Sequence, residues 1–289
     1  APAAEAWVLS CHSAGPSTVE DGEFKGQTLE QVWENHKEIC GTNGNKFEFF
    51  PILIKFIDAK NNLSIQVHPD NDYAMRVEGE YGKTEAWYIL DCDEGAELIL
   101  GFNREVSVEE FKKAAQSEEM LNIVNKVKVK KGDLFFIESG TLHAICKGIL
   151  LAEVQQNSNT TYRVYDYGRV GADGKPRALH IDKAADVTKL CPTTITNASE
   201  REVEKQDGGT RTHLTECDLF KMYSVETDGE YVSEAGDESF VSLLCLDGSA
   251  EVVCGKKTLG MKKGESLFIP ASSGEFKIIG KTHMLETRI

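Results

Sequence analysis

The stretch "GDLFFIESGTLHAI", residues 132–145, decides the fold prediction. Its first half aligns without a gap with the start of "GESLFIPASSGEFKI", residues 264–278. Both copies read glycine, an acidic residue, two variable residues, phenylalanine and isoleucine, which is typical of a turn followed by a buried strand. Because an internal repeat indicates two copies of one structural unit, we expect two related β barrels.

Outward from this repeat, the chain shows many short apolar strands separated by glycine and aspartate, a pattern that favours jelly rolls over a parallel α/β sheet. Helices are few, and two capping-box patterns mark insertions near residues 27–40 and 107–121. The polar stretch 197–213 reads as a linker. We therefore expect a mostly β chain, with one domain over residues 1–205 and a second over residues 206–289.

Composition limits the partners of the protein. The 289 residues carry 32 Lys and Arg against 47 Asp and Glu, a net charge of −15, which disfavours nucleic acid and anionic lipid. No apolar run is long enough for a membrane span, and residues 1–10 lack the features of a signal peptide. Eight scattered cysteines without a CxxC pair read as reduced thiols. We expect a soluble, cytoplasmic protein, either a monomer or a weak homodimer, with no nucleic-acid or membrane partner.

Four side chains are candidate metal ligands. In "LSIQVHPD", residues 63–70, strand alternation places Gln66 and His68 on one face. Glu85 begins the strand "EAWYIL", and His143 follows the glycine turn of the repeat. Two imidazoles, a carboxylate and an amide oxygen suit zinc or another borderline divalent ion. A lone histidine on a strand is more often an ordinary surface or core residue, so the prediction depends on all four coming together.

The two copies of the repeat differ at the position of His143, which falls on Glu275 in the second copy. If the first copy binds a metal through His143, the second lacks that ligand. We therefore expect the second barrel to be metal-free and structural.

Four motifs in order carry a resemblance. They are "LSIQVHPD", "GKTEAWYIL" at 82–90, "ESGTLHAI" at 138–145 and "LAEVQQNSNTTYRVYDYGR" at 151–169. Together they resemble the short bacterial class of type I mannose-6-phosphate isomerases, within the cupin superfamily. One departure is Glu138, where the cupin signature usually has proline. A second is the start of the chain: relatives usually have a further segment before "EAWVLS", so we expect an edge strand to be lacking.

The resemblance implies two cupin-type jelly-roll barrels, one zinc ion per chain and interconversion of mannose 6-phosphate and fructose 6-phosphate, with a small phosphorylated sugar as substrate. The family's metal ligands fall on Gln66, His68, Glu85 and His143. Its catalytic residues fall on Arg163, Lys83 and Glu153, and its substrate-binding residues on Ser64, Arg169 and His12.

The chemistry of aldose–ketose isomerisation accounts for these residue types. A proton moves between C1 and C2 through an enediol, so the site needs a Lewis acid, a cation for developing oxyanion charge and a base. Arg163 suits the cationic role because it does not lose its proton. The base is left open among Glu153, Lys83 and a zinc-bound water, since Glu153 could instead orient Arg163. Arg169 could equally be an ordinary exposed charge.

Two other functions fit the same pocket. A non-catalytic sugar-phosphate sensor would keep the site without turnover, but the presence of Arg163 beside a full ligand set argues against it. An iron cupin dioxygenase would use the same barrel with a histidine-rich ligand set. The amide of Gln66 argues against that function.

Overall fold

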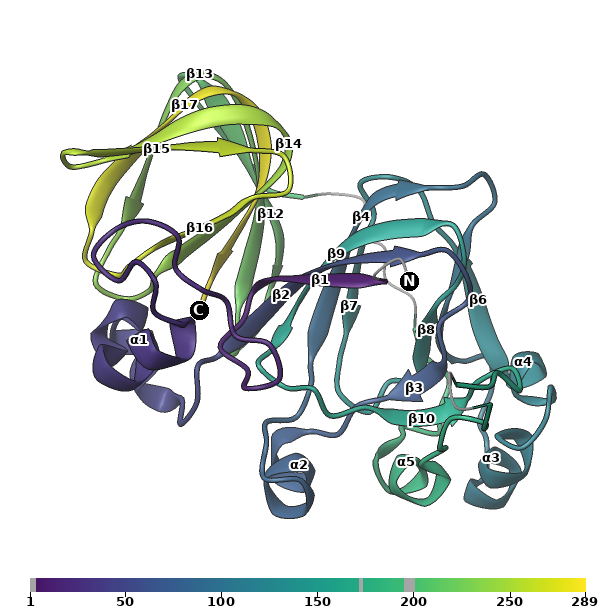
Figure 1. The fold of residues 1–289 in the computed structure, drawn as a ribbon. Helices are drawn as coiled ribbons and strands as arrows, with labels where there is room; N and C mark the ends of the chain where they lie inside the picture. Colours follow the sequence, from purple (N-terminus) through teal and green to yellow (C-terminus); the bar gives the residue numbers. More distant parts are fainter. Residues whose placement is uncertain (1–3, 172–173, 195–200) are drawn as a thin grey trace. The chain divides into compact units, whose positions relative to one another are not determined.

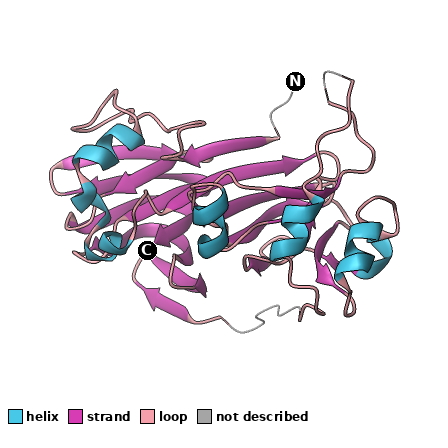
Figure 2. Ribbon diagram, turned by 90° about the horizontal axis from the view of Figure 1, so that it is seen from below, coloured by secondary structure: helices cyan, strands magenta, loops and turns pink. Residues whose placement is uncertain are grey.

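The computed structural model describes residues 4–171, 174–194 and 201–289. The chain divides into two compact units: the first unit spans residues 1–6 and 55–197, and the second unit spans residues 7–54 and 198–289. Strands dominate the structure, with a few short helices (Figure 2). The prediction of a mostly β chain is confirmed. Residues 7–54 group with the C-terminal stretch, and the expected division at residue 205 into a catalytic and a structural domain stays a prediction.

Strands β1 to β10 form two antiparallel five-stranded sheets. The order of one is β1-β2-β9-β4-β7, and these strands are β1 (Glu5–Leu9), β2 (Ile52–Ala59), β9 (Ile149–Gln156), β4 (Glu85–Cys92) and β7 (Leu134–Ile137). The order of the other is β10-β3-β8-β5-β6, and these strands are β10 (Tyr162–Tyr165), β3 (Ile65–Val67), β8 (His143–Ile145), β5 (Glu97–Phe102) and β6 (Val124–Lys128). Neighbouring strands are distant in sequence, so residues from many motifs meet in one place.

Short helices cover one face of the sheet that contains β3 and β10. They are α2 (Asn71–Val77), α3 (Val108–Ala114), α4 (Met120–Ile123) and α5 (Ile181–Val187), and Figure 1 shows α5 beside β10 and α3 next to α5. Ile65 and Val67 of β3 belong to the same apolar cluster as Phe111 of α3 and Ala184 of α5. Among the helices of the described residues, none combines the length and apolar character that crossing a membrane requires.

The opposite face of this sheet looks into the interior of the first unit. A second apolar cluster lies there, with Trp87, Ile89 and Leu151 from one sheet and Leu98 from the other. Because side chains alternate along a strand, Gln66 points inward while its neighbours Ile65 and Val67 pack under the helices. The predicted alternation of the motif at residues 63–70 is thus observed.

The second unit contains a seven-stranded sheet of order β11-β12-β13-β17-β14-β15, in which β16 also pairs with β14. These strands are β11 (Val203–Gln206), β12 (Gly209–Glu216), β13 (Lys221–Ala235), β17 (Gly274–Arg288), β14 (Val241–Cys254), β15 (Lys257–Lys262) and β16 (Ser266–Ile269). The unit also holds α1 (Leu29–Asn35) and the 3₁₀ helices η1 (Lys37–Cys40) and η2 (Thr42–Lys46). The capping box predicted near residues 27–40 is present and is formed by Thr28 and Gln31 at the start of α1.

The internal repeat has a structural counterpart. Gly132 and Gly264 have φ angles of 87° and 90°, and each lies two residues before the start of a short strand, β7 or β16. A positive φ is easily adopted only by glycine, so both copies keep that residue at the turn. The repeated sequence therefore marks the same turn-and-strand unit twice.

Candidate metal centre

Three ionisable side chains converge in the interior of the first unit. His68 Nε2 lies 3.6 Å from Glu85 Oε2, and His143 Nε2 lies 3.3 Å from Glu85 Oε1. All three side chains are almost completely buried. Within the described residues, this is the one group of three such side chains whose ligand atoms all lie within 4.8 Å of one another. Three of the four predicted ligands therefore come together from β4, β8 and the end of β3.

The hydrogen bonds of the two histidines leave the converging atoms available. His68 Nδ1 contacts the carbonyl of Thr160 at 2.9 Å, and His143 Nδ1 contacts the carbonyl of Thr141 at 2.8 Å. Each Nδ1 must donate to its carbonyl, so each Nε2 presents a lone pair toward Glu85. Among the described residues, His68 Nε2 and Glu85 Oε1 have no hydrogen-bond partner although both are buried. Such unsatisfied acceptors, aimed at one point, fit a bound cation.

Burial also sets the charge of these side chains. It lowers the pKa of His143 to about 4 and that of His68 well below its ordinary value, so both imidazoles are neutral at pH 7. Burial, together with the charge of Glu153, raises the pKa of Glu85 to about 7 in the absence of a metal. Neutral imidazoles and a carboxylate are the forms in which these residues bind divalent metals.

Strand pairing explains how these residues meet. Gln66 is directly opposite His143 across β3 and β8, and Arg163 is directly opposite Gln66 across β10 and β3. Residues opposite each other in an antiparallel pair share a face, so one row carries all three. The turn before β8 is fixed by Gly140, which has φ of 83° and donates its N–H to the carbonyl of His68.

Gln66, the fourth predicted ligand, lies at the edge of the group. Its amide nitrogen is 3.5 Å from His143 Nε2, and its amide oxygen is 3.5 Å from the hydroxyl of Ser64. A rotation of the amide by half a turn would exchange the two atoms and direct the oxygen toward the histidines. The ligand role of Gln66 and the substrate-binding role of Ser64 stay predictions.

A buried chain of alternating charges continues from the three ligands. Lys83 Nζ lies 3.0 Å from Glu85 Oε2 and 3.9 Å from Glu153 Oε1. Lys55 of β2 lies 3.6 Å from the same oxygen of Glu153, and Trp87 Nε1 donates to Glu153 Oε2 at 2.8 Å. Burial alone would raise the pKa of Glu153, but the two lysines and the Trp87 N–H outweigh it and lower the pKa. Two of the predicted catalytic residues, Lys83 and Glu153, thus adjoin the ligands.

Two residues next to the candidate ligands, Lys55 and Trp87, were not predicted from the sequence. Lys55 interrupts the apolar run of β2, "ILIKFIDA", and a single cation inside a buried strand was the available signal. Trp87 lies two residues after Glu85, on the same face of β4, and opposite Glu153 in the β4–β9 pairing.

The two predicted arginines, Arg163 and Arg169, belong to or follow β10, on the side of Gln66 away from His143. Arg163 donates from Nη1 to the carbonyl of Ala178 at 3.0 Å, and its buried Nε has no partner among the described residues. Arg169 donates to the carboxylate of Asp166 and to the carbonyl of Asn62. Arg169 is therefore anchored by two neighbouring groups, and its substrate-binding role stays a prediction.

His12, the last predicted residue, belongs to the second unit. Its ring packs edge-on against Trp7, with 5.7 Å between ring centres. Its substrate-binding role stays a prediction.

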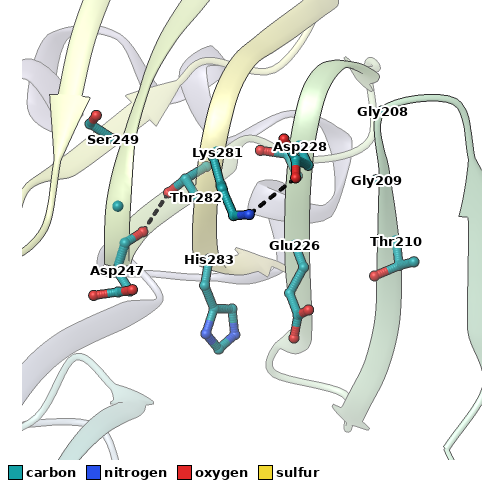
Figure 3. A pocket seen from close by; sticks show the side chains of 12 residues that line it. Gly208, Gly209, Thr210, Glu226, Asp228, Asp247, Ser249, Lys281, Thr282 and His283 are labelled. Atoms are coloured by element: carbon teal, nitrogen blue, oxygen red, sulfur yellow. Dashed lines mark hydrogen bonds and ion pairs between the residues drawn. The ribbon is translucent and has the colours of Figure 1, made fainter.

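A hollow of about 740 Å³ lies in the second unit and is lined by residues of β12, β13, β14 and β17. Figure 3 shows Lys281 paired with Asp228, and His283 beside Glu226. These side chains do not form a three-ligand group of the kind found around Glu85 in the described residues. Glu275, the repeat counterpart of His143, is exposed on β17. The metal-free character of this unit stays a prediction.

Comparisons with protein families and with known proteins point to one family. Residues 1–103 match the family described as phosphomannose isomerase type I, catalytic domain, and residues 210–288 match the cupin domain of mannose-6-phosphate isomerase. The chain is 39% identical to the mannose-6-phosphate isomerase ManA of Bacillus subtilis over 96% of its own length and 86% of that protein. It is also 37% identical to the mannose-6-phosphate isomerase of Streptococcus mutans, over 97% of its own length and 87% of that protein.

A solved structure extends the match to three dimensions. The crystal structure of mannose 6-phosphate isomerase from Bacillus subtilis superposes with a TM-score of 0.90 and 39% identity, covering 99% of this chain and 90% of that one. Identity at this level over nearly the whole of both chains, joined to the buried His68–Glu85–His143 group, leaves one conclusion: the chain belongs to the type I mannose-6-phosphate isomerase family.

Proposed function

We propose that this protein interconverts mannose 6-phosphate and fructose 6-phosphate, using one divalent metal ion bound by His68, Glu85 and His143. The observation that carries the proposal is the set of buried, unsatisfied ligand atoms around one point, beside two lysines and a second carboxylate. Without a bound cation such a cluster costs free energy, because unpaired buried polar atoms destabilise a fold. The names of the relatives supply the substrate.

Zinc is the metal we propose. Two imidazole nitrogens and a carboxylate oxygen are a common zinc ligand set, and the amide oxygen of Gln66 would complete four ligands. The carbonyls of Thr141 and Thr160 hold the two rings through their Nδ1 atoms, which orients both Nε2 atoms before a metal binds. When bound, zinc would act as a Lewis acid toward a carbonyl or hydroxyl oxygen of the open-chain sugar.

The proton transfer between C1 and C2 is assigned to Glu153. Lys55, Lys83 and Trp87 all contact its carboxylate, which keeps it ionised inside the barrel. Its Oε1 atom is buried and has no hydrogen-bond partner among the described residues, so it can accept a proton from carbon. A base between two cations also holds its accepted proton weakly and can return it to the neighbouring carbon.

Charge that develops on the sugar oxygens during this transfer needs cations. Lys83 lies between Glu85 and Glu153, and Arg163 extends from the same row of side chains as Gln66 and His143. Fixed cations in a water-poor site stabilise an enediolate without reorganisation. We assign Lys83 and Arg163 to this role, with Ser64 and Arg169 as substrate contacts.

The remaining expectations follow from this function. A small phosphorylated sugar is the only partner the mechanism requires, and an assembly no larger than a weak homodimer is expected. Location in the cytoplasm is inferred from the eight cysteines, all of which are free thiols in the structure.

The experiment that tests this proposal is turnover in heavy water. Mannose 6-phosphate is incubated with the zinc-loaded protein in D₂O, and the fructose 6-phosphate formed is analysed for deuterium at C1. Proton transfer through an enediol on a carboxylate base predicts product in which part of the hydrogen at C1 is solvent deuterium, because the proton held on Glu153 exchanges with D₂O in a fraction of turnovers. Product without deuterium would contradict exchange through the base, and absence of product would contradict the proposed activity itself.

A further inference from the structure

A cluster of arginines surrounds one buried carboxylate next to the candidate metal centre. Asp166, which follows β10 directly, is only 5% exposed. It accepts hydrogen bonds from Arg169 Nε at 3.1 Å and from Arg177 Nε at 2.7 Å, and the Nη2 atom of each arginine contacts the same carboxylate. One anion thus holds two guanidinium groups through two contacts each.

This arrangement has more positive charge than Asp166 requires. A single arginine is enough to neutralise a buried carboxylate, and here Arg163 also lies within electrostatic reach of both Arg169 and Arg177. Three guanidinium groups against one carboxylate leave two positive charges in a protein whose net charge is −15. Like charges repel, so the cluster gains stability when a further anion binds.

The arginines also keep donors that the fold does not use. Arg163 Nε is buried without a partner among the described residues. Arg177 uses Nε and Nη2 on Asp166, which leaves Nη1 for another acceptor. The side chains of Arg169 and Arg177 are 33% and 41% exposed, whereas Asp166 is withdrawn beneath them. The cations therefore face solvent and the compensating anion does not.

The cluster adjoins the row of side chains that contains the candidate ligands. Arg163 is opposite Gln66 in the β10–β3 register. Arg169 Nη1 donates to the carbonyl of Asn62, two residues before Ser64, and the Ser64 hydroxyl contacts Gln66. A ligand that reaches the metal centre with one end can meet these arginines with the other.

We infer that Arg177 binds the phosphate group of the substrate together with Arg169, that Asp166 is the positioning residue that holds both arginines in place, and that Arg163, assigned above to the enediolate, adds only its charge to this site. Planar guanidinium groups bind phosphate oxygens through paired hydrogen bonds, which lysine does not reproduce. This inference rests on the proposed function for the identity of the substrate, but the affinity of the cluster for phosphate does not depend on turnover.

The test uses inorganic phosphate as the probe. Its affinity for the zinc-loaded chain is measured by calorimetry, and KM and kcat for mannose 6-phosphate are measured in parallel. Variants are Arg177→Ala, Arg177→Lys and Asp166→Asn, and the matched control is Arg104→Ala. Arg104 is also paired with one carboxylate, Glu110, but both side chains lie on the exposed surface of the first unit.

Loss of a charged hydrogen bond to phosphate predicts that Arg177→Ala weakens phosphate binding and raises KM by about tenfold or more, while kcat changes less than about threefold. Arg177→Lys recovers part of the affinity because it restores charge without the guanidinium fork. Asp166→Asn also raises KM, and Arg104→Ala changes neither quantity.

A purely structural role gives a different pattern. Arg177→Ala would then lower the unfolding midpoint and leave the phosphate affinity and KM of the folded protein unchanged, which would overturn the inference. If the wild type binds phosphate through Arg177 but does not isomerise sugar phosphates, the proposed function fails and the anion site stands. If it isomerises with KM insensitive to Arg177→Ala, the proposed function stands and the anion site fails.

Discussion

Lys83 Nζ lies 3.0 Å from Glu85 Oε2, and both side chains are almost completely buried. A buried ammonium group beside a buried carboxylate is costly to desolvate, so its presence requires compensation. Glu85 and Glu153 both surround it and raise the pKa of Lys83 against the effect of burial. The pair thus links the candidate metal centre to the candidate base.

Removal of this cation is expected to destabilise the metal-free protein. In Lys83→Met the chain keeps its length, but two buried carboxylates lose a shared counter-ion, and the free energy of unfolding should fall by about 3–5 kcal/mol. Denaturant unfolding in the presence of a chelator measures it. The control Lys112→Met breaks an ion pair of 2.6 Å with exposed Asp182 and should cost less than about 1 kcal/mol. Equal losses in the two variants would show that Lys83 is not held by the buried carboxylates.

Metal content should depend on the two histidines. In His68→Ala and His143→Ala the affinity for zinc should drop more than about 100-fold, because even the loss of a partner that only orients a ligand costs 10-fold to 100-fold. Elemental analysis after dialysis against a weak chelator measures the bound zinc per chain. His283→Ala, in the second unit and outside the three-ligand group, should keep the wild-type content. Zinc retained by both active-site variants would place the metal elsewhere.

The hydrogen bond from Trp87 to Glu153 should affect catalysis. Trp87→Phe keeps an aromatic ring but removes the N–H that donates to Glu153 Oε2 at 2.8 Å. A hydrogen bond to a charged group contributes about 1.5–3 kcal/mol, so kcat should fall by roughly tenfold to 100-fold if Glu153 is the base. Trp33→Phe, a buried tryptophan on α1 in the second unit, is the matched control. Unchanged kcat in Trp87→Phe would contradict the assignment of Glu153 as the base.

The free energy of unfolding should fall at low pH, in part because Asp166 becomes protonated. Burial alone would raise its pKa, but hydrogen bonds from Arg177 and Arg169 outweigh it and hold the pKa below the ordinary value. Because the folded-state pKa is lowered, the stabilisation is complete above the unfolded value of about 3.9 and is lost as the pH falls further. Unfolding free energies between pH 5 and acid conditions should therefore drop less steeply in Asp166→Asn than in the wild type, as denaturant titrations at each pH would measure. Identical slopes would mean that Asp166 is not ion-paired in solution.

Much of the fold could be predicted from local sequence because the strands keep a clear alternation. The alternation alone places Gln66 and His68 on one face, and the repeated turn at Gly132 and Gly264 is followed by a short strand in both copies. The grouping of residues 7–54 with the C-terminal stretch could not be read from sequence, since it depends on contacts between segments far apart in the chain.

The site residues also divide into those that local sequence can predict and those that depend on contacts between distant segments. His68, Glu85 and His143 can be picked out because strand alternation, the glycine turn of the repeat and the four ordered motifs point to them together; a histidine on a strand alone is not enough. Lys55 and Trp87 did not, because a lysine or tryptophan in an apolar strand gains its meaning only from the carboxylate that strand pairing brings opposite it. Asp166 and Arg177 were missed for a related reason: their ion pair joins a strand end to a loop eleven residues later.

The most direct test of the central claim is isomerisation of mannose 6-phosphate before metal removal, after metal removal, and after zinc is added back, with Glu85→Gln assayed alongside. The account predicts that chelation abolishes fructose 6-phosphate formation, that zinc restores it in the wild type, and that Glu85→Gln stays inactive at the same zinc concentration. Undiminished turnover by the chelated, metal-free protein, or full activity of Glu85→Gln, would contradict it.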